Sequence, residues 1–151
     1  MKNTFYIIAI AMFTLTSCKK EATAEEKALA TQIEAYDALM TEAMEVHDEI
    51  MPKMGELMEL QGEITEKAET GELSDANQSS IVAEELTKSH DGMMTWMKDY
   101  SEKFPYGEPS PETKEAIDEK LPALEQEVEE IKELRDQTME AIENAKALLN
   151  K

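Results

Sequence analysis

The sequence is poor in the residues that several protein classes require. It contains one Cys in 151 residues, so no disulfide can form within the chain. Five Gly and five Pro are too few turn residues for an all-β fold. Only 15 Lys and Arg stand against 34 Asp and Glu, which gives a net charge of −19. This imbalance excludes a nucleic-acid partner and a basic contact with anionic lipid, because both need a positively charged surface.

The signatures of an enzyme are also missing. The chain has no phosphate-binding Gly loop, no His-Glu-x-x-His segment and no Ser at a nucleophile elbow. Acidic residues are plentiful, but runs such as the one between residues 125 and 133 follow the spacing of exposed helical faces. A ferritin-like metal site needs Glu three residues before His, whereas Met44 and Thr87 hold that place before His47 and His90. We therefore expect no catalytic residues and no enzymatic activity.

The N-terminal segment has the features of a secretory signal peptide. Lys2 supplies a positive start, and residues 5–15 form an apolar run that only Thr14 interrupts. The run is too short for a stable membrane-spanning helix, which needs about 20 apolar residues. It has instead the length typical of a signal-peptide core. We therefore expect residues 1–17 to be removed.

The end of this run carries a resemblance to a known processing site. Leu15-Thr16-Ser17-Cys18 resembles the lipobox of bacterial lipoproteins. The resemblance implies cleavage before Cys18 and a membrane anchor made of a diacylglycerol thioether and an acylated amine on that residue. Residues 18–26 would then form a lipidated tether. Lys19 and Lys20 do not resemble the inner-membrane retention signal, which has Asp in that place, so we expect the outer membrane of the bacterial cell envelope.

The rest of the chain has helical periodicity and no alternation typical of β-strands. Apolar positions recur at gaps of three and four residues in three segments, about 27–69, 75–103 and 111–149. Thr70-Gly71-Glu72 and the turn-forming residues 104–109 separate these segments. Because short connections make neighbouring helices antiparallel, residues 27–151 are predicted to form an all-α, up-down-up three-helix bundle.

Each segment has one apolar stripe that we expect to face the core. Ser74 and Ser110 are the predicted N-caps of the second and third segments, with Pro111 in the first helical position, and Gly71 is a predicted left-handed C-terminal cap. The stripes comprise Ile33, Tyr36, Met40, Ala43, His47, Ile50, Met54, Leu57, Gln61, Ile64 and Ala68; Ala83, Leu86, His90, Met93, Met97, Tyr100 and Phe104; and Ile117, Leu121, Leu124, Val128, Ile131, Arg135, Thr138, Ile142, Ala145 and Leu149.

Methionine is frequent, and its positions are uneven. The chain has 11 Met, against three Phe and one Trp. Beyond the predicted signal peptide, every Met except Met139 falls in two windows, 40–58 and 90–97, which also contain both His residues. Positions three, four and seven apart share a helix face. With a turn centred near residue 72, the two windows lie at one height, with His47 level with Met97, Met51 with Met93 and Met54 with His90.

Thioether and imidazole groups at one height favour a soft monovalent cation. Such ligands suit Cu(I) or Ag(I), whereas Zn²⁺ prefers thiolate, imidazole and carboxylate. The sequence therefore predicts a Cu(I) or Ag(I) site between the first two predicted helices, with Trp96 and Met94 as second choices and Trp96 acting through its ring face. The candidate ligands, of which three or four would bind, are His47, Met51, Met54, His90, Met93 and Met97.

Other residues of the two windows add weaker indications of a site. Asp48 and Asp91 each follow a His and are candidates to orient its ring, although adjacent helical positions do not face each other. Pro52, Gly55 and Gly92 break the rules of helix composition in the same windows, as residues at functional sites often do.

Two interpretations without a metal stay open. Met is a flexible filler of helical cores, so the stripe is also consistent with a structural or protein-interaction lipoprotein that has no metal ligand. A Met-rich surface can in addition adapt its shape to a partner helix.

The two windows also carry a family resemblance. The segments His47-Asp48-Glu49-Ile50-Met51-Pro52-Lys53-Met54 and His90-Asp91-Gly92-Met93-Met94-Thr95-Trp96-Met97 resemble a group of small helical bacterial lipoproteins that are often labelled "viral A-type inclusion protein". The resemblance covers the lipobox and the first two predicted helices, and more loosely the third. It implies a helical envelope lipoprotein and supplies no activity.

Overall fold

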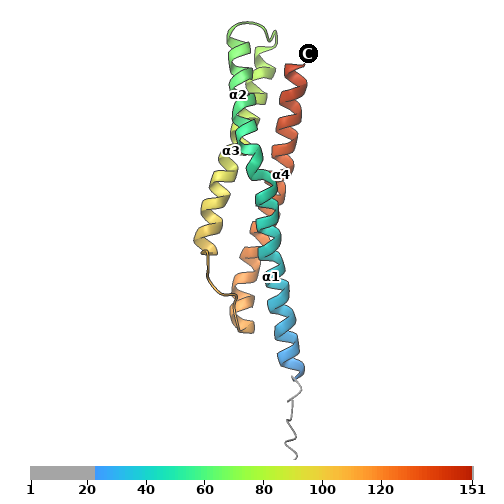
Figure 1. Ribbon diagram of the computed structural model, residues 1–151, viewed down its shortest axis with the longest axis vertical. Helices are drawn as coiled ribbons and strands as arrows, with labels where there is room; N and C mark the ends of the chain where they lie inside the picture. The colour runs from blue at the N-terminus through green and yellow to red at the C-terminus, as the bar shows by residue number, and fades with distance from the viewer. Residues whose placement is uncertain (1–22, 151) are drawn as a thin grey trace, which may run out of the picture.

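A computed structural model describes residues 23–150, and the helices in that range form the predicted up-down-up bundle (Figure 1). The elements are α1 (Ala24–Ile50), the 3₁₀ turn η1 (Met51–Lys53), α2 (Met54–Glu69), α3 (Ala76–Lys103) and α4 (Lys114–Leu149). The predicted signal peptide, Cys18 and residues 18–22 of the predicted tether lie outside the described residues. Along residues 23–150, no helix combines the length and apolar character needed to cross a bilayer.

The helix starts differ from the predicted ones because other side chains provide the caps. α1 begins at Ala24 rather than at residue 27, since Thr23 and Glu26 form a reciprocal capping box there. Asp75, not Ser74, caps α3 by accepting a hydrogen bond from the Gln78 amide at 3.0 Å.

The predicted cap of the third helix is wrong for a similar reason. Thr113 caps α4, which starts at Lys114 rather than at residue 111, by accepting a hydrogen bond from the Ala116 amide at 3.2 Å. The hydroxyl of Ser110 donates instead to Asp37 on α1. The predicted C-terminal cap at Gly71 is confirmed, because this residue has a positive φ of 76°.

The predicted helix 27–69 is interrupted at Met51–Lys53. Pro52 has no amide hydrogen to donate, and the backbone tightens into the 3₁₀ turn η1 at this point. α2 then continues upward from α1, with a change of direction between them (Figure 1). The first of the three arms of the bundle is therefore made of α1, η1 and α2.

The predicted stripes form the core. None of their positions is exposed, and Leu57, Ile64, Leu86 and Ile131 are completely buried. Burial of one such aliphatic side chain contributes about 1.5–3 kcal/mol, so these rows dominate the stability of the bundle. α4 packs against α1, α2 and α3. α3 and α4 approach closely at Gly92, where an added Cβ would lie 2.7 Å from Leu134 Cδ2.

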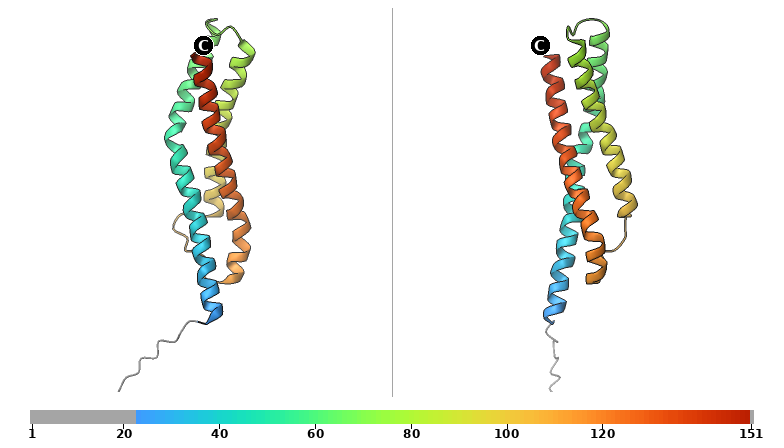
Figure 2. Two further views of the ribbon diagram at one scale, coloured as in Figure 1. Left: turned by 90° about the vertical axis from the view of Figure 1, so that its right-hand side faces the viewer. Right: turned by 180° about the vertical axis from the view of Figure 1, so that it is seen from behind.

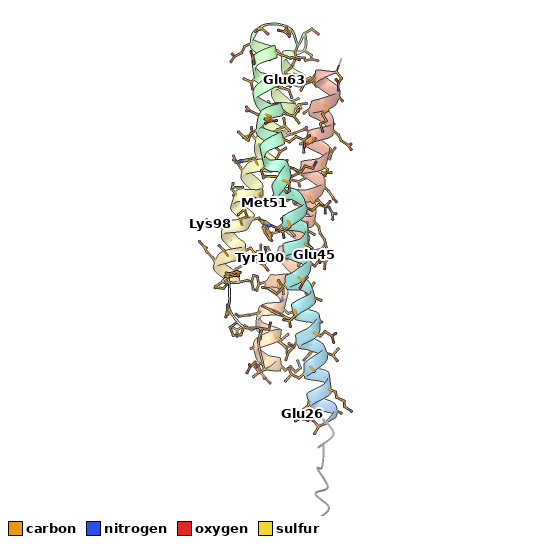
Figure 3. The ribbon with its side chains drawn as sticks, viewed as in Figure 1. Glu26, Glu45, Met51, Glu63, Lys98 and Tyr100 are labelled. Atoms are coloured by element: carbon orange, nitrogen blue, oxygen red, sulfur yellow. The ribbon has the colours of Figure 1, made fainter. Side chains whose placement is uncertain are left out.

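The acidic side chains lie mainly on the outside of the bundle. Figure 3 shows Glu26, Glu45 and Glu63 along the length of the first arm, and all three are exposed. Lys132 and Lys146 of α4 reach across to Glu42 of α1 and Glu56 of α2, at 2.7 and 2.5 Å. Such surface pairs contribute about 0–1 kcal/mol each, so they tie the helices together only weakly.

α1 and α3 diverge at the lower end of the bundle. α1 packs mainly against α4, and the views in Figures 1 and 2 show the end of α3 leaning away from α1 before the loop that leads to α4. α1 also extends below the start of α4. The divergence leaves room for a groove between α1 and α3.

Candidate functional site

The groove between α1 and α3 has a volume of about 370 Å³ and an aromatic and thioether lining. α1 contributes one face, α3 contributes the opposite face, and the loop after α3 closes one end. The lining residues are Met40, Met44 and His47 from α1, Trp96, Met97, Tyr100 and Ser101 from α3, and Phe104, Tyr106 and Gly107 from the end of α3 and the loop. We call this site the α1–α3 groove.

A row of four rings forms the wall of the groove. The ring centroids of His47 and Trp96 lie 6.0 Å apart, those of Trp96 and Tyr100 4.7 Å apart, and those of Tyr100 and Phe104 5.2 Å apart. Because Trp96, Tyr100 and Phe104 follow one another at four-residue intervals, they occupy successive turns at the end of α3. Offset aromatic pairs at these distances stabilise the wall by about 0.5–1.5 kcal/mol each beyond their burial.

Hydrogen bonds hold two of these rings in place. The indole N–H of Trp96 donates to the backbone oxygen of Glu127 on α4 at 3.0 Å. The hydroxyl of Tyr100 donates to Met40 Sδ at 3.4 Å. Burial, together with the nearby Tyr36 and Glu127, raises the pKa of Tyr100 to about 12, so its hydroxyl remains a neutral donor at physiological pH.

The imidazole of His47 is oriented by its neighbour in sequence. Its Nδ1 lies 3.0 Å from Asp48 Oδ1, and its side chain is 15% exposed. A carboxylate accepts a hydrogen bond from an N–H group, so of the two tautomers of an uncharged imidazole this contact favours the one with hydrogen on Nδ1. Nε2 then carries the lone pair, which is the arrangement of a histidine ligand supported by a carboxylate. His90 makes the corresponding contact with Asp91 at 3.2 Å.

The structure brings together three of the residues singled out from the sequence. His47, Met97 and Trp96 line the same groove, and the His47–Trp96 contact lies one residue from the predicted pairing of His47 with Met97. The position along the bundle axis that a turn near residue 72 predicts for His47 relative to α3 is therefore correct to within one residue. Met40 and Met44, which fall in the first window but were not among the candidate ligands, supply two further thioethers.

The remaining candidate ligands lie elsewhere in the bundle. Met93 is completely buried and Met54 is 8% exposed, and both belong to the core. Met51 is partly buried against the core, whereas Met94 is 40% exposed on α3. The side chain of His90 is 29% exposed. None of these five residues lines the α1–α3 groove.

Met40 and Met44 could have been selected from the sequence by helix geometry. Met40, Met44 and His47 are spaced by four and three residues and therefore share a face of α1. Met51 and Met54 satisfy the same rule relative to His47, so the rule alone does not choose between the two directions along the helix. The divergence of α1 and α3 makes that choice, because it opens the α1–α3 groove on the Met40 side of His47.

The residues that break helix rules have separate explanations. Pro52 accompanies the 3₁₀ turn, and Gly92 permits close packing on Leu134. Gly55 has open space around the position of a Cβ. None of them lines the α1–α3 groove.

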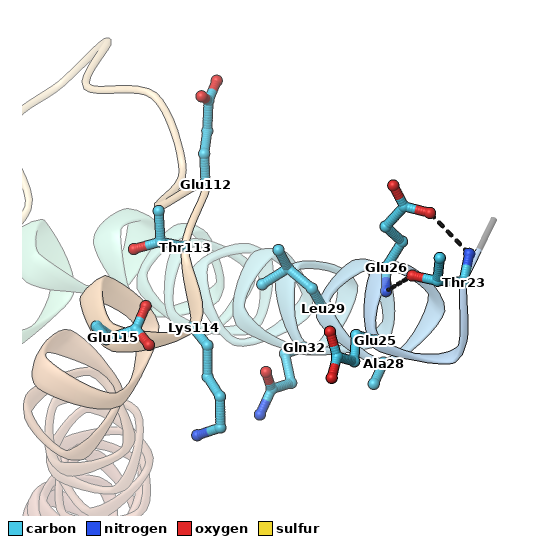
Figure 4. Close-up of a pocket in the computed structure, with 10 residues that line it drawn as sticks. All are labelled: Thr23, Glu25, Glu26, Ala28, Leu29, Gln32, Glu112, Thr113, Lys114 and Glu115. Carbon is cyan, nitrogen blue, oxygen red and sulfur yellow. Dashed lines mark hydrogen bonds between the residues drawn. The ribbon is translucent and has the colours of Figure 1, made fainter.

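A second, wider pocket lies at the N-terminal end of α1. It has a volume of about 740 Å³ between the first turns of α1 and the start of α4, and Glu25, Glu26, Glu112 and Glu115 are among its lining residues. Figure 4 shows that these carboxylates are spread over α1, the loop before α4 and the start of α4 rather than converging, and Glu26 is engaged in the capping box. Within residues 23–150, no three His, Cys, Asp or Glu side chains are grouped so that they could hold a metal ion.

No protein-family model matches the chain, and no curated protein or solved structure is significantly similar to it.

Proposed function

We propose that this chain is a lipid-anchored protein of the bacterial cell envelope that binds Cu(I) or Ag(I) in the α1–α3 groove. The observation that supports the proposal is that one groove gathers the imidazole of His47 and the thioethers of Met40, Met44 and Met97. Three or four of these groups would coordinate the cation. This set keeps His47 and Met97 from the sequence prediction and replaces the buried Met54 and Met93 by Met40 and Met44.

The donor types select the metal. Neutral imidazole and thioether sulfur are borderline and soft ligands, which suit Cu(I) and the similar Ag(I) and suit Mg²⁺, Ca²⁺ or Mn²⁺ poorly. A thioether needs no deprotonation to bind. For an extracytoplasmic protein this is an advantage, because a free thiolate in that place is prone to oxidation.

The side chains of the groove have the freedom that coordination requires. Met has three rotatable side-chain bonds, so sulfur atoms on facing helices can move together around an ion. The bond from the Tyr100 hydroxyl to Met40 Sδ is a weak one to a neutral thioether, and a cation can replace it. The Trp96 ring lies beside His47 and would add a cation–π contact.

The test is a competitive Cu(I) titration of the full chain in detergent against a chromophoric Cu(I) chelator, with the emission of Trp96, the single Trp, as a second signal. We expect a dissociation constant below the micromolar range. His47→Ala should weaken binding by at least the tenfold to hundredfold that outer-shell groups contribute at metal sites.

His90→Ala is the matched control, because His90 makes the same kind of Asp contact but does not line the groove. Its affinity should equal that of the unchanged protein. Binding weaker than micromolar, or an equal loss in both His variants, would contradict the proposed metal site.

The groove also favours a second candidate, a protein-interaction lipoprotein without a metal ligand. Its lining is largely apolar, and Tyr106 at its end is fully exposed, with a relative exposure of 107%. Amphipathic aromatic residues at the edge of an apolar groove are typical of contact surfaces. The Cu(I) titration separates the two candidates, because this one requires no affinity for the cation.

A further inference from the structure

Four methionine side chains in the described part of the chain are exposed to solvent. Met44, Met58, Met94 and Met139 have relative exposures of 40, 45, 40 and 43%. Of these, Met44 alone lines the α1–α3 groove. The four residues are therefore similarly exposed and differ in whether oxidation would reach the groove.

The other thioethers of the groove are better protected than Met44. Met40 and Met97 are partly buried and pack against the core, and Met40 Sδ also accepts the hydrogen bond from the Tyr100 hydroxyl. Oxidation of a thioether needs a sulfur lone pair that the oxidant can approach. Met44 lacks both kinds of protection, so an oxidant should attack it before Met40 or Met97.

We propose that Met44 is an oxidative modification site that switches off the α1–α3 groove. A peroxide transfers one oxygen atom to Met44 Sδ: the S–O bond forms and the O–O bond breaks. The sulfur loses two electrons, and the peroxide is reduced to water or an alcohol. The product, methionine sulfoxide, is polar and is restored to the thioether by methionine sulfoxide reductases.

The chemical consequence follows from where Met44 lies, and this step rests on the proposed function. Met44 is one helical turn from His47, on the face that lines the groove. Sulfoxide formation uses one of the two sulfur lone pairs, weakens the other as a donor and adds a hard oxygen donor, which suits Cu(I) and Ag(I) poorly. It also puts a strongly polar group against the aromatic wall, so the oxidised groove loses its fit to a soft cation.

Two variants of the full chain, studied in detergent, separate this site from general oxidation. In the first, Met58, Met94 and Met139 are replaced by Leu, which leaves Met44 as the exposed thioether of residues 23–150. In the second, Met44→Leu removes the proposed site and keeps the other three. Both proteins receive the same limited dose of hydrogen peroxide. Peptide mapping by mass spectrometry then locates the sulfoxides, and an Ag(I) titration measures affinity before and after oxidation.

We expect the Met44 sulfoxide to form before those of Met40 and Met97 in the first variant, with Ag(I) affinity falling by about tenfold or more and returning after reductase treatment. In the Met44→Leu variant, the lower initial affinity should not change on oxidation. Oxidation of Met40 or Met97 as fast as Met44, or full affinity in the Met44 sulfoxide form, would overturn the proposal. Absence of Ag(I) binding before oxidation would instead refute the metal site, and the order of oxidation would still be measured by the peptide map.

Discussion

Glu127 shows how one residue can depart from the rule that acidic side chains lie outside. Among residues 23–150 it is the only charged side chain that is buried, with no exposed area. Its Oε1 lies 2.5 Å from Lys103 Nζ, while its Oε2 is buried without a hydrogen-bond partner. The hydrogen bond that Lys103 Nζ donates to Glu127 raises the pKa of Lys103. Removal of Lys103 would therefore leave a buried carboxylate with no partner.

We predict that Lys103→Met lowers the free energy of unfolding by about 3 kcal/mol at pH 7, because it removes the partner of a fully buried carboxyl group. Lys98→Met on the same helix is the control, because Lys98 pairs with Glu102 at 3.3 Å with both side chains exposed, and its loss should be below about 1 kcal/mol. Urea unfolding followed by circular dichroism measures both. Equal losses in the two variants would show that the Glu127–Lys103 pair contributes no more to stability than an exposed pair. Since the pKa of Lys103 is raised in the folded state, the contribution of the pair to stability should be lost only as the pH rises through this raised pKa.

At the groove, sequence and structure agree on some residues and differ on others for a clear reason. Periodicity placed His47, Met51 and Met54 on one helix face, and all three do face the bundle. Periodicity does not distinguish a position packed in the core from one that lines an opening. Met54 fills the core, whereas Met44, which lies beside the predicted stripe, reaches the groove.

At the scale of the helices, the start of each helix depends on which of several neighbouring side chains caps it. Ser74 and Asp75 are adjacent candidates, and Asp75 is the one whose carboxylate meets a free amide. Ser110 has a partner on another helix, which no local pattern could indicate. The turn at Gly71 was predictable because a backbone with positive φ at the end of a helix strongly favours Gly.

Two glycines provide a matched test of helix energetics. Gly55 lies inside α2 with open space around it, so Gly55→Ala should stabilise the protein by about 0.5–1 kcal/mol, a rise in Tm of a few degrees. Gly71→Ala should lower stability by about 1 kcal/mol, because its φ of 76° strains a residue with a Cβ. Calorimetry of the two variants measures the shifts. A fall in Tm for Gly55→Ala would mean that Gly55 has a role beyond the helix itself.

For the whole molecule, the predicted lipid anchor leads to one testable expectation. We predict that Cys18→Ala prevents lipid attachment and moves the protein from the membrane fraction to the soluble fraction. Labelling with radioactive palmitate and fractionation of cells measure the two effects. Ser17→Ala, which keeps a small residue before the Cys, should retain both the label and the membrane location. Unchanged processing of the Cys18→Ala protein would count against the lipobox interpretation.

The sequence by itself determined the bundle. Gaps of three and four residues fixed which side of each helix is apolar, and Gly71 and residues 104–109 fixed where the chain reverses. The topology followed from these features, and so did the placing of His47 level with Met97, one residue from the Trp96 that it contacts. Only the tertiary structure decided where the groove lies. α1 packs on α4 while α3 leans away from α1, and this divergence depends on contacts between distant segments, such as the bond from Trp96 to Glu127 and the approach of Gly92 to Leu134. Local periodicity contains no information on such contacts. For that reason it could not identify Met40 and Met44, rather than Met54 and Met93, as residues that line the groove.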